Sequence, residues 1–376
     1  DSFSSGTDVA PETLADTQIV YGADNGLTLI NMRGLDFDDP LWDDLLDELT
    51  ADEIYNTIGV SGYGIEYIDS VEKPFNIDAD TAAGLLYGGT GAMFPNAMTL
   101  AQTWNLDLAS EYGTMIGNEG LLGGADGWYA PSMNIHRTPY SGRNGEYYSE
   151  DAFLSGAVAS REVYGAASKG MYTYIKHFAL NDQETNRCAF LLTYSNEQAI
   201  REIYLKPFEL CIKNFDGTQI AVMSSFNWIG TVPACANEDT LTTILRNEWG
   251  FQGMVITDYD GSYGYMITDH CVRTGNDLML GFSSQASNQL TNTESATLNN
   301  ALRTSCKNIM YTIANSGYYT NTTDDSGMSN MTKLFVTIDV VTVLLVVLCM
   351  ALVIVRYRKK HAKTTAEVTP EEKKEE

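Results

Sequence analysis

The stretch GFQGMVITDYDG, residues 250–261, runs an apolar segment straight into a carboxylate. Residues 254–257 are Met-Val-Ile-Thr, Asp258 follows them, and Gly261 ends the extended pattern. One interpretation is a buried strand that ends in a polar turn with solvated aspartates. The other is a carboxylate held at the carboxyl end of a barrel strand, where catalytic groups of (β/α) barrels lie. The chain around this stretch decides between the two.

Strand and helix patterns alternate along the chain. A capping box at Thr50 and Glu53 predicts the start of a helix. Further helices are predicted at 104–122, 149–170, 195–213 and 238–249, with strands between them at 127–136, 171–179, 219–227 and 253–257. The apolar face of the helix at 149–170 is expected to contain Phe153, Ala157, Val158 and Tyr164. This alternation is typical of a parallel sheet with crossover helices. It predicts an α/β fold, a TIM-like barrel of the (β/α)8 type, across residues 45–316.

Three of the predicted strands end in polar residues: Lys176–His177, Ser224–Ser225 and Asp258. In a barrel of parallel strands these ends meet at one face, which is the face that carries catalysis. This pattern favours a chemical role for Asp258 over a solvated turn.

Composition excludes several classes of function. The net charge of −26 argues against nucleic acid as a partner, because phosphates need Lys and Arg. It suits a neutral substrate such as a sugar. The six cysteines form no C-x-x-C pair, and the four histidines form no H-E-x-x-H motif. We therefore expect neither a metal nor an organic cofactor.

The C-terminal region predicts a membrane anchor. Residues 334–355 are apolar apart from Asp339, and about 20 such residues cross a bilayer. A buried core helix is the alternative. The basic run RYRKKHAK follows the apolar segment, which places the tail 356–376 in the cytoplasm and the preceding chain outside the plasma membrane. Residues 317–333 are expected to be a polar linker, and residues 1–44 a linker or the end of an upstream domain.

Four stretches carry a resemblance to a known family: APSMNIHRTPYSGRNGEYYSED (130–151), KHFALNDQETNR (176–187), AVMSSFN (221–227) and TLTTILRNEWGFQGMVITDYDG (240–261). In order and spacing they resemble glycoside hydrolase family 3 over residues 45–315. The resemblance implies a retaining exo-β-glycosidase of the β-glucosidase or β-xylosidase type, with Asp258 as its nucleophile. The residues that would line the first sugar subsite are Asp80, Arg143, Lys176, His177, Met223, Phe226 and Tyr259.

The same residues have structural alternatives. Lys176 and His177 could form an ion-paired strand end, Asp80 could cap a helix, and Arg143 could pair with Glu146 or Glu150.

The chain departs from the family pattern in three ways. Phe226 stands where the family often has Tyr, and Tyr259 replaces a common Trp. The family's general acid/base is usually a Glu of an α/β sandwich domain, which is expected here from an upstream domain or a second chain. Glu184 is the one internal carboxylate considered as a substitute. A membrane-tethered carbohydrate-binding protein without catalysis is therefore the alternative function.

Overall fold

The computed structural model describes residues 19–86, 91–215, 218–260, 263–281, 290, 294–321 and 330–366. The chain divides into two units, residues 1–321 and 322–376, and each is described by itself.

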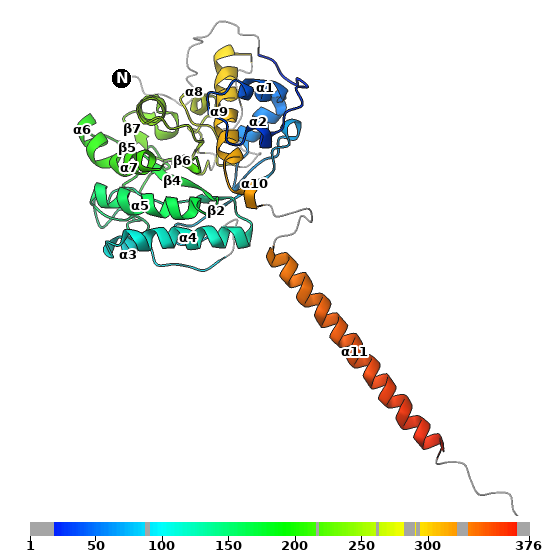
Figure 1. Ribbon diagram of the computed structural model, residues 1–376. Helices are drawn as coiled ribbons and strands as arrows, with labels where there is room; N and C mark the ends of the chain where they lie inside the picture. The colour runs from blue at the N-terminus through cyan, green and yellow to red at the C-terminus, as the bar shows by residue number, and fades with distance from the viewer. Residues whose placement is uncertain are drawn as a thin grey trace, which may run out of the picture. The chain divides into compact units, whose positions relative to one another are not determined.

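The first unit is built on a six-stranded sheet in the order β1-β2-β3-β4-β6-β9 (Figure 1). Its strands are β1 (Gly64–Ile65), β2 (Asn76–Asp80), β3 (Gly127–Tyr129), β4 (Tyr172–Phe178), β6 (Ile220–Ser224) and β9 (Val255–Ile256). From β2 to β9 all neighbouring strands are parallel, whereas β1 pairs with β2 in the antiparallel sense. The central strand β4 is buried along its whole length.

Backbone hydrogen bonds continue the sheet beyond β9 and return it to β2. Leu278 forms a parallel bridge with Ile256, and the N–H of Met279 donates to the Ile58 carbonyl at 3.0 Å. On the other side, the N–H of Asp78 donates to the Tyr63 carbonyl at 3.1 Å. The described residues thus form a TIM-like β/α fold. The eight strand–helix units of the predicted barrel are not seen among them, because short segments replace regular strands between β9 and β2.

Helices connect the parallel strands and cover the sheet. They are η1 (Leu29–Met32), α1 (Leu41–Glu48), α2 (Ala51–Gly59), η2 (Asp69–Val71), α3 (Ala97–Gln102), α4 (Leu106–Gly123), α5 (Ala152–Ala167), α6 (Glu197–Ala199), η3 (Ile200–Tyr204), α7 (Lys206–Asn214), η4 (Ala234–Ala236), η5 (Asp239–Glu248), α8 (Thr268–Arg273), α9 (Ala296–Ala314) and α10 (Tyr318–Asn321). Segments η3 and η5 are π-helical. The predicted capping box is confirmed, since the Thr50 side chain accepts from the N–H of Glu53.

Residues on the strands alternate between two apolar cores, as the period of a strand requires. Trp128, Ile175 and Val255 point to an outer core shared with α4, α5, α7 and η5. Tyr129, Tyr174 and Ile256 point to an inner core shared with α1, α2 and α9. Figure 1 shows α4 and α5 side by side on one side of the sheet and α9 next to α1 and α2 on the other.

The contact between α4 and α5 is made by small residues. A Cβ on Gly113 would overlap the carbonyl oxygen of Glu162, and one on Gly165 would overlap that of Ser110. The two helix backbones therefore touch directly, and only glycine fits at these positions. Phe153 and Tyr164 were predicted to face the core from α5, but both are exposed because the glycine face is the buried one.

Residues 19–44 do not form a linker, in contrast to the prediction for 1–44. Leu29, Met32 and Trp42 are fully buried in the inner core, and the Arg33 guanidinium donates to the Ala314 carbonyl at 2.7 Å. Residues 1–18 lie outside the described residues, as do 322–329 of the predicted 317–333 linker.

A second, three-stranded sheet lies beside η3 and η5. It contains β5 (Leu192–Thr193), β7 (Trp228–Ile229) and β8 (Val232–Pro233) in the order β5-β7-β8. Strand β7 begins two residues after Phe226. The short segment after β6 therefore connects the six-stranded sheet to the three-stranded sheet.

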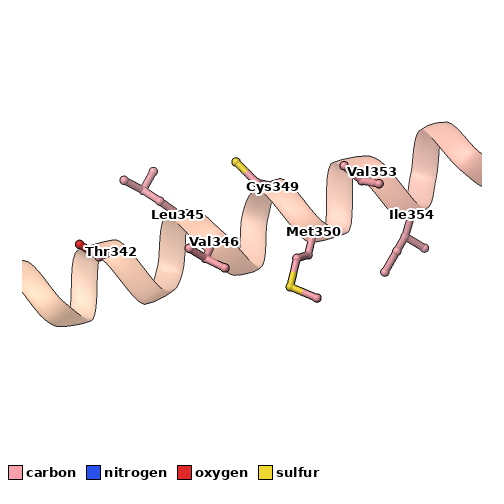
Figure 2. A pocket seen from close by; sticks show the side chains of 7 residues that line it. All are labelled: Thr342, Leu345, Val346, Cys349, Met350, Val353 and Ile354. Carbon is pink, nitrogen blue, oxygen red and sulfur yellow. The ribbon is translucent and has the colours of Figure 1, made fainter.

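Among its described residues, the second unit contains one helix, α11 (Asn330–Ala366). An 18-residue window within the section Leu334–Lys359 has a mean hydropathy of 3.1, and none of that window is buried. By length and composition this helix could cross a membrane. Figure 2 shows seven of its side chains, from Thr342 to Ile354, that line an apolar groove along the helix.

Candidate active site

Four sequence-predicted residues come from the carboxyl ends of three parallel strands. Asp80 is the last residue of β2, Lys176 and His177 lie near the end of β4, and Asp258 follows β9 by two residues. The register between β4 and β6 shifts between Ile175 and Phe178. Such a bulge re-aims side chains, and here two successive residues, Lys176 and His177, both contact carboxylates of the site.

Lys176 joins two carboxylates. Its Nζ donates to Asp80 Oδ1 at 3.0 Å and lies 3.8 Å from Glu146 Oε1. The residue is 4% exposed, so its charge is shielded from water and depends on these partners. Lys176 therefore forms the ion-paired strand end that was its structural alternative, and the side chain of Asp80 remains partly exposed.

Arg143 pairs with Glu146, which was the structural alternative for this residue. Its Nε and Nη2 donate to the two Glu146 oxygens at 2.7 and 2.8 Å. Burial raises the pKa of Glu146, but the charges of Lys176 and Arg143 outweigh it and bring that pKa down to about 2. Arg143 Nη1 also lies 3.7 Å from Glu184 Oε1.

Asp258 is 8% exposed and has one satisfied oxygen. Its Oδ1 accepts from the N–H of Tyr259 at 2.7 Å, whereas its buried Oδ2 has no hydrogen-bond partner in the described part of the chain. His177 Nε2 lies 3.7 Å and Arg187 Nη1 3.8 Å from that Oδ2. This oxygen therefore has two nearby nitrogen atoms but no hydrogen bond among the described residues.

Neighbouring cations alone would lower the pKa of Asp258, but its pKa is raised overall. Burial raises the pKa of Asp258 by more than Arg187, Arg143 and Lys176 lower it. Burial likewise holds the pKa of His177 well below 6.5, with Arg143 and Lys176 adding to the effect. His177 is thus a neutral imidazole beside Asp258 and not one of its cations.

Arg187 is the site residue that the sequence analysis did not single out. Its Nε lies 3.0 Å from Glu184 Oε2 in an ion pair, and its guanidinium carbon lies 4.3 Å from the centre of the Phe226 ring. Arg187 lies in an irregular segment between β4 and β5, where no periodic pattern predicts the direction of a side chain. The same contacts show that Glu184 is engaged by two arginines, which disfavours it as a free acid.

The remaining predicted residues lie around this cluster. Phe226 is buried beneath Arg187, and its carbonyl accepts from the Tyr265 hydroxyl at 2.9 Å. Tyr259 is 36% exposed next to Asp258. Met223 lies on β6 within the inner core, among apolar side chains.

Below this cluster, the sheet interior contains a buried carboxyl group. Asp78, two residues before Asp80 on β2, accepts from the hydroxyls of Tyr172 at 2.7 Å, Tyr174 at 2.9 Å and Tyr129 at 3.3 Å. Burial raises the pKa of Asp78 to about 7 despite these bonds. The three tyrosines fix β2, β3 and β4 together one layer beneath Asp80 and Lys176.

Within the described ranges, no group of three His, Cys, Asp or Glu side chains is arranged to hold a metal ion. The chemistry of the site is that of paired charges around one carboxylate with a free oxygen.

Comparison with known proteins gives this arrangement a family. The model of the glycosyl hydrolase family 3 N terminal domain matches residues 66–287. Beta-glucosidase B of Emericella nidulans is 42% identical over 176 residues, which cover 46% of this chain and 20% of that protein. The beta-glucosidase of Rhizobium radiobacter is 36% identical over 246 residues, covering 63% of this chain and 29% of that protein.

Solved structures agree. Beta-glucosidase 3B from Thermotoga neapolitana in complex with alpha-D-glucose has a TM-score of 0.66 and 31% identity, and the match covers 78% of this chain and 45% of that one. The beta-glucosidase from Paenibacillus barengoltzii has a TM-score of 0.69 and 29% identity, covering 84% and 37%. The chain thus spans less than half the length of each of these relatives. Its matched domain and its fold show that the chain belongs to glycosyl hydrolase family 3.

Proposed function

We propose that this chain is the barrel part of a retaining, exo-acting β-glycosidase of the β-glucosidase or β-xylosidase type. The observation that carries the proposal is the buried, unbonded Oδ2 of Asp258, which lies 3.7 Å from His177 and 3.8 Å from Arg187. A retaining enzyme needs such a carboxylate to attack the anomeric carbon and form a glycosyl–enzyme intermediate. Two of the relatives are beta-glucosidases, which supports the substrate class.

The polar contacts supply the rest of a first sugar subsite. Asp80 keeps oxygen lone pairs for sugar hydroxyls while Lys176 neutralises its charge. Contacts run from Asp80 through Lys176 and Glu146 to Arg143, so the hydroxyl-binding groups are held in one network. A fixed network orients the terminal sugar without reorganisation at the moment of reaction.

The general acid is proposed to come from outside this sequence, on an upstream sandwich domain or a second chain. Near Asp258 the described carboxyl groups are engaged: Glu146 with Arg143 and Lys176, and Glu184 with Arg143 and Arg187. Neither is placed to keep the proton that a leaving-group oxygen requires. The same observation favours the alternative function, a tethered carbohydrate-binding protein without catalysis.

One experiment separates the two functions. The protein is incubated with 2,4-dinitrophenyl 2-deoxy-2-fluoro-β-glucoside or the matching β-xyloside, whose leaving group needs no acid. Intact mass and peptide mapping then locate any adduct. We expect a glycosyl adduct on Asp258 that is absent from Asp258→Asn. A folded protein that binds glucose but acquires no adduct, even with the upstream domain supplied, would support the binding protein.

We further propose that α11 anchors the protein in the plasma membrane, with the sugar site outside and the tail inside. The proposal is supported by the hydropathy of Leu334–Lys359 and by the basic residues Arg356, Arg358 and Lys359 at its end.

A further inference from the structure

A second cleft lies beside the small sheet, apart from the charged cluster around Asp258. It has a volume of about 560 Å³, in the range of ligand sites in proteins. One wall is the β7–β8 hairpin with the chain after β5, and the other is formed by the π-helical segments η3 and η5. π-Helical turns are rare and are frequent at functional sites, and both segments line this one cleft.

The cleft offers an aromatic ring and several polar groups to a ligand. Tyr194 is 69% exposed at its edge. Ser195, Thr231, Asp239 and Thr243 also line it, and the part of the chain described by the structure gives their side chains no hydrogen bond or ion pair. Three hydroxyls and one carboxylate are therefore available together next to an exposed ring.

The charges of the cleft exclude an anionic ligand. Arg201 is its one cation among the described lining residues, and it is already bonded to Glu197 at 2.9 Å and to Glu248 at 2.6 Å. Asp239 adds a negative charge without a counterion in the same described region. A phosphate or carboxylate would meet net repulsion here, whereas a neutral ligand would not.

The lining also has an apolar part, formed by Ile200, Ile229, Val232 and Ile244. A pyranose ring presents an apolar C–H face and a rim of hydroxyls, which is the combination that this cleft matches. We infer that the cleft is a second, non-catalytic carbohydrate site, in which a neutral sugar stacks on Tyr194 and its hydroxyls bind Ser195, Thr231, Asp239 and Thr243.

The cleft is connected to the candidate active site by short contacts. Thr193 accepts from Asn227 Nδ2 at 3.1 Å, and Asn227 follows Phe226, on which the Arg187 guanidinium lies. A sugar in the cleft would therefore be held on the segment that also supports the surroundings of Asp258. This placement suits a site that retains a longer neutral oligosaccharide near the enzyme. The inference does not require that Asp258 be catalytic.

The test uses the full chain as the Asp258→Asn variant, which prevents hydrolysis, in a detergent without a sugar headgroup. Binding of cellotetraose, laminaritetraose and xylotetraose is measured by titration calorimetry. Two further substitutions are added separately: Asp80→Ala removes the first subsite, and Tyr194→Ala removes the platform of the cleft. Tyr164→Ala, which truncates a 53% exposed tyrosine on α5, is the matched control. Thr231→Lys, which extends a charged chain into the cleft, is a second cleft variant.

We expect one of the three tetrasaccharides to bind, and this binding should persist in Asp80→Ala. Its affinity should fall about tenfold or more in Tyr194→Ala and in Thr231→Lys. Tyr164→Ala should bind as the parent does. The inference is overturned if no tetrasaccharide binds to the Asp80→Ala protein at about 10 mM, or if Tyr194→Ala and Thr231→Lys bind as tightly as Tyr164→Ala. If Asp80→Ala alone abolishes all binding, the sugar bound only at the first subsite. The proposed first subsite would then stand, and only the proposal of a second site would be rejected.

Discussion

Replacement of Arg187 by Met should make the attack by Asp258 sensitive to acid. Arg187 is the nearest permanent positive charge to the free oxygen of Asp258, at 3.8 Å, because His177 is neutral. Coulomb's law gives about 4 kcal/mol for two charges at that distance with an effective dielectric constant of about 20. Arg187 is partly exposed, so solvent screens much of this. If screening leaves one third of this Coulomb energy, about 1.4 kcal/mol, the protonation equilibrium of Asp258 still changes tenfold.

Burial already raises the pKa of Asp258, and loss of Arg187 raises it further, so the carboxylate is protonated over a wider acidic range. We expect the rate of labelling by the 2-fluoro glycoside to fall by up to about tenfold relative to wild type on the acidic side of the pH profile, and much less at pH 8. The rate is measured by intact mass against time across this pH range.

Arg303→Met is the matched control, because it removes a partly buried arginine that is bonded to Asp47 at 2.6 Å, away from the site. Its labelling rate should follow the wild-type pH profile. A folded Arg187→Met protein whose pH profile also coincides with wild type would refute the electrostatic role of Arg187.

Three other perturbations follow from the structure. Lys176→Met should lower the free energy of unfolding in urea by about 3 kcal/mol, because it leaves Asp80 without its cation and Glu146 with Arg143 alone. Loss of the exposed Lys213–Glu209 pair should cost under about 1 kcal/mol, and equal losses would contradict this. Glu162→Gln should flatten the dependence of stability on pH: burial raises the pKa of Glu162 to about 8, so the folded wild type binds a proton that the unfolded chain releases near 4.5, and its stability falls by up to about 4 kcal/mol as pH rises between these values. Parallel stability curves for the two proteins would count against it. Leu348→Arg should weaken insertion of the full chain into lipid vesicles by about 3 kcal/mol, measured by flotation; unchanged flotation would exclude α11 as the anchor.

The sequence predicted the order of strands and helices because each has its own hydrophobic period. It also placed Lys176, His177 and Asp258 together, since the carboxyl ends of parallel strands meet at one face. Asp80 was added only by the resemblance to the family, because no strand was predicted before it. The predicted face of α5 was wrong because large apolar residues were counted as core. Phe153 and Tyr164 are exposed, while glycines make the helix contact.

Other features have no local signal. Strict alternation along β4 would direct Lys176 and His177 to opposite faces, and only the shifted register with β6 brings both to carboxylates of the site. Arg187 reaches Asp258 from an irregular segment, so its direction depends on tertiary contacts. The pKa of Asp258 is raised because burial outweighs the nearby cations, and the sequence shows the cations but not the burial.

The direct backbone contact of α4 and α5 has a consequence for genetic variation. Helix α5 leads into β4, the strand that carries Lys176 and His177. A Gly→Ala change at Gly113 or Gly165 adds one methyl group, yet it forces apart two helices that have no space for it. In a genetic screen, such alleles would map to the outside of the domain and be scored as conservative, while they displace the strand that carries Lys176 and His177.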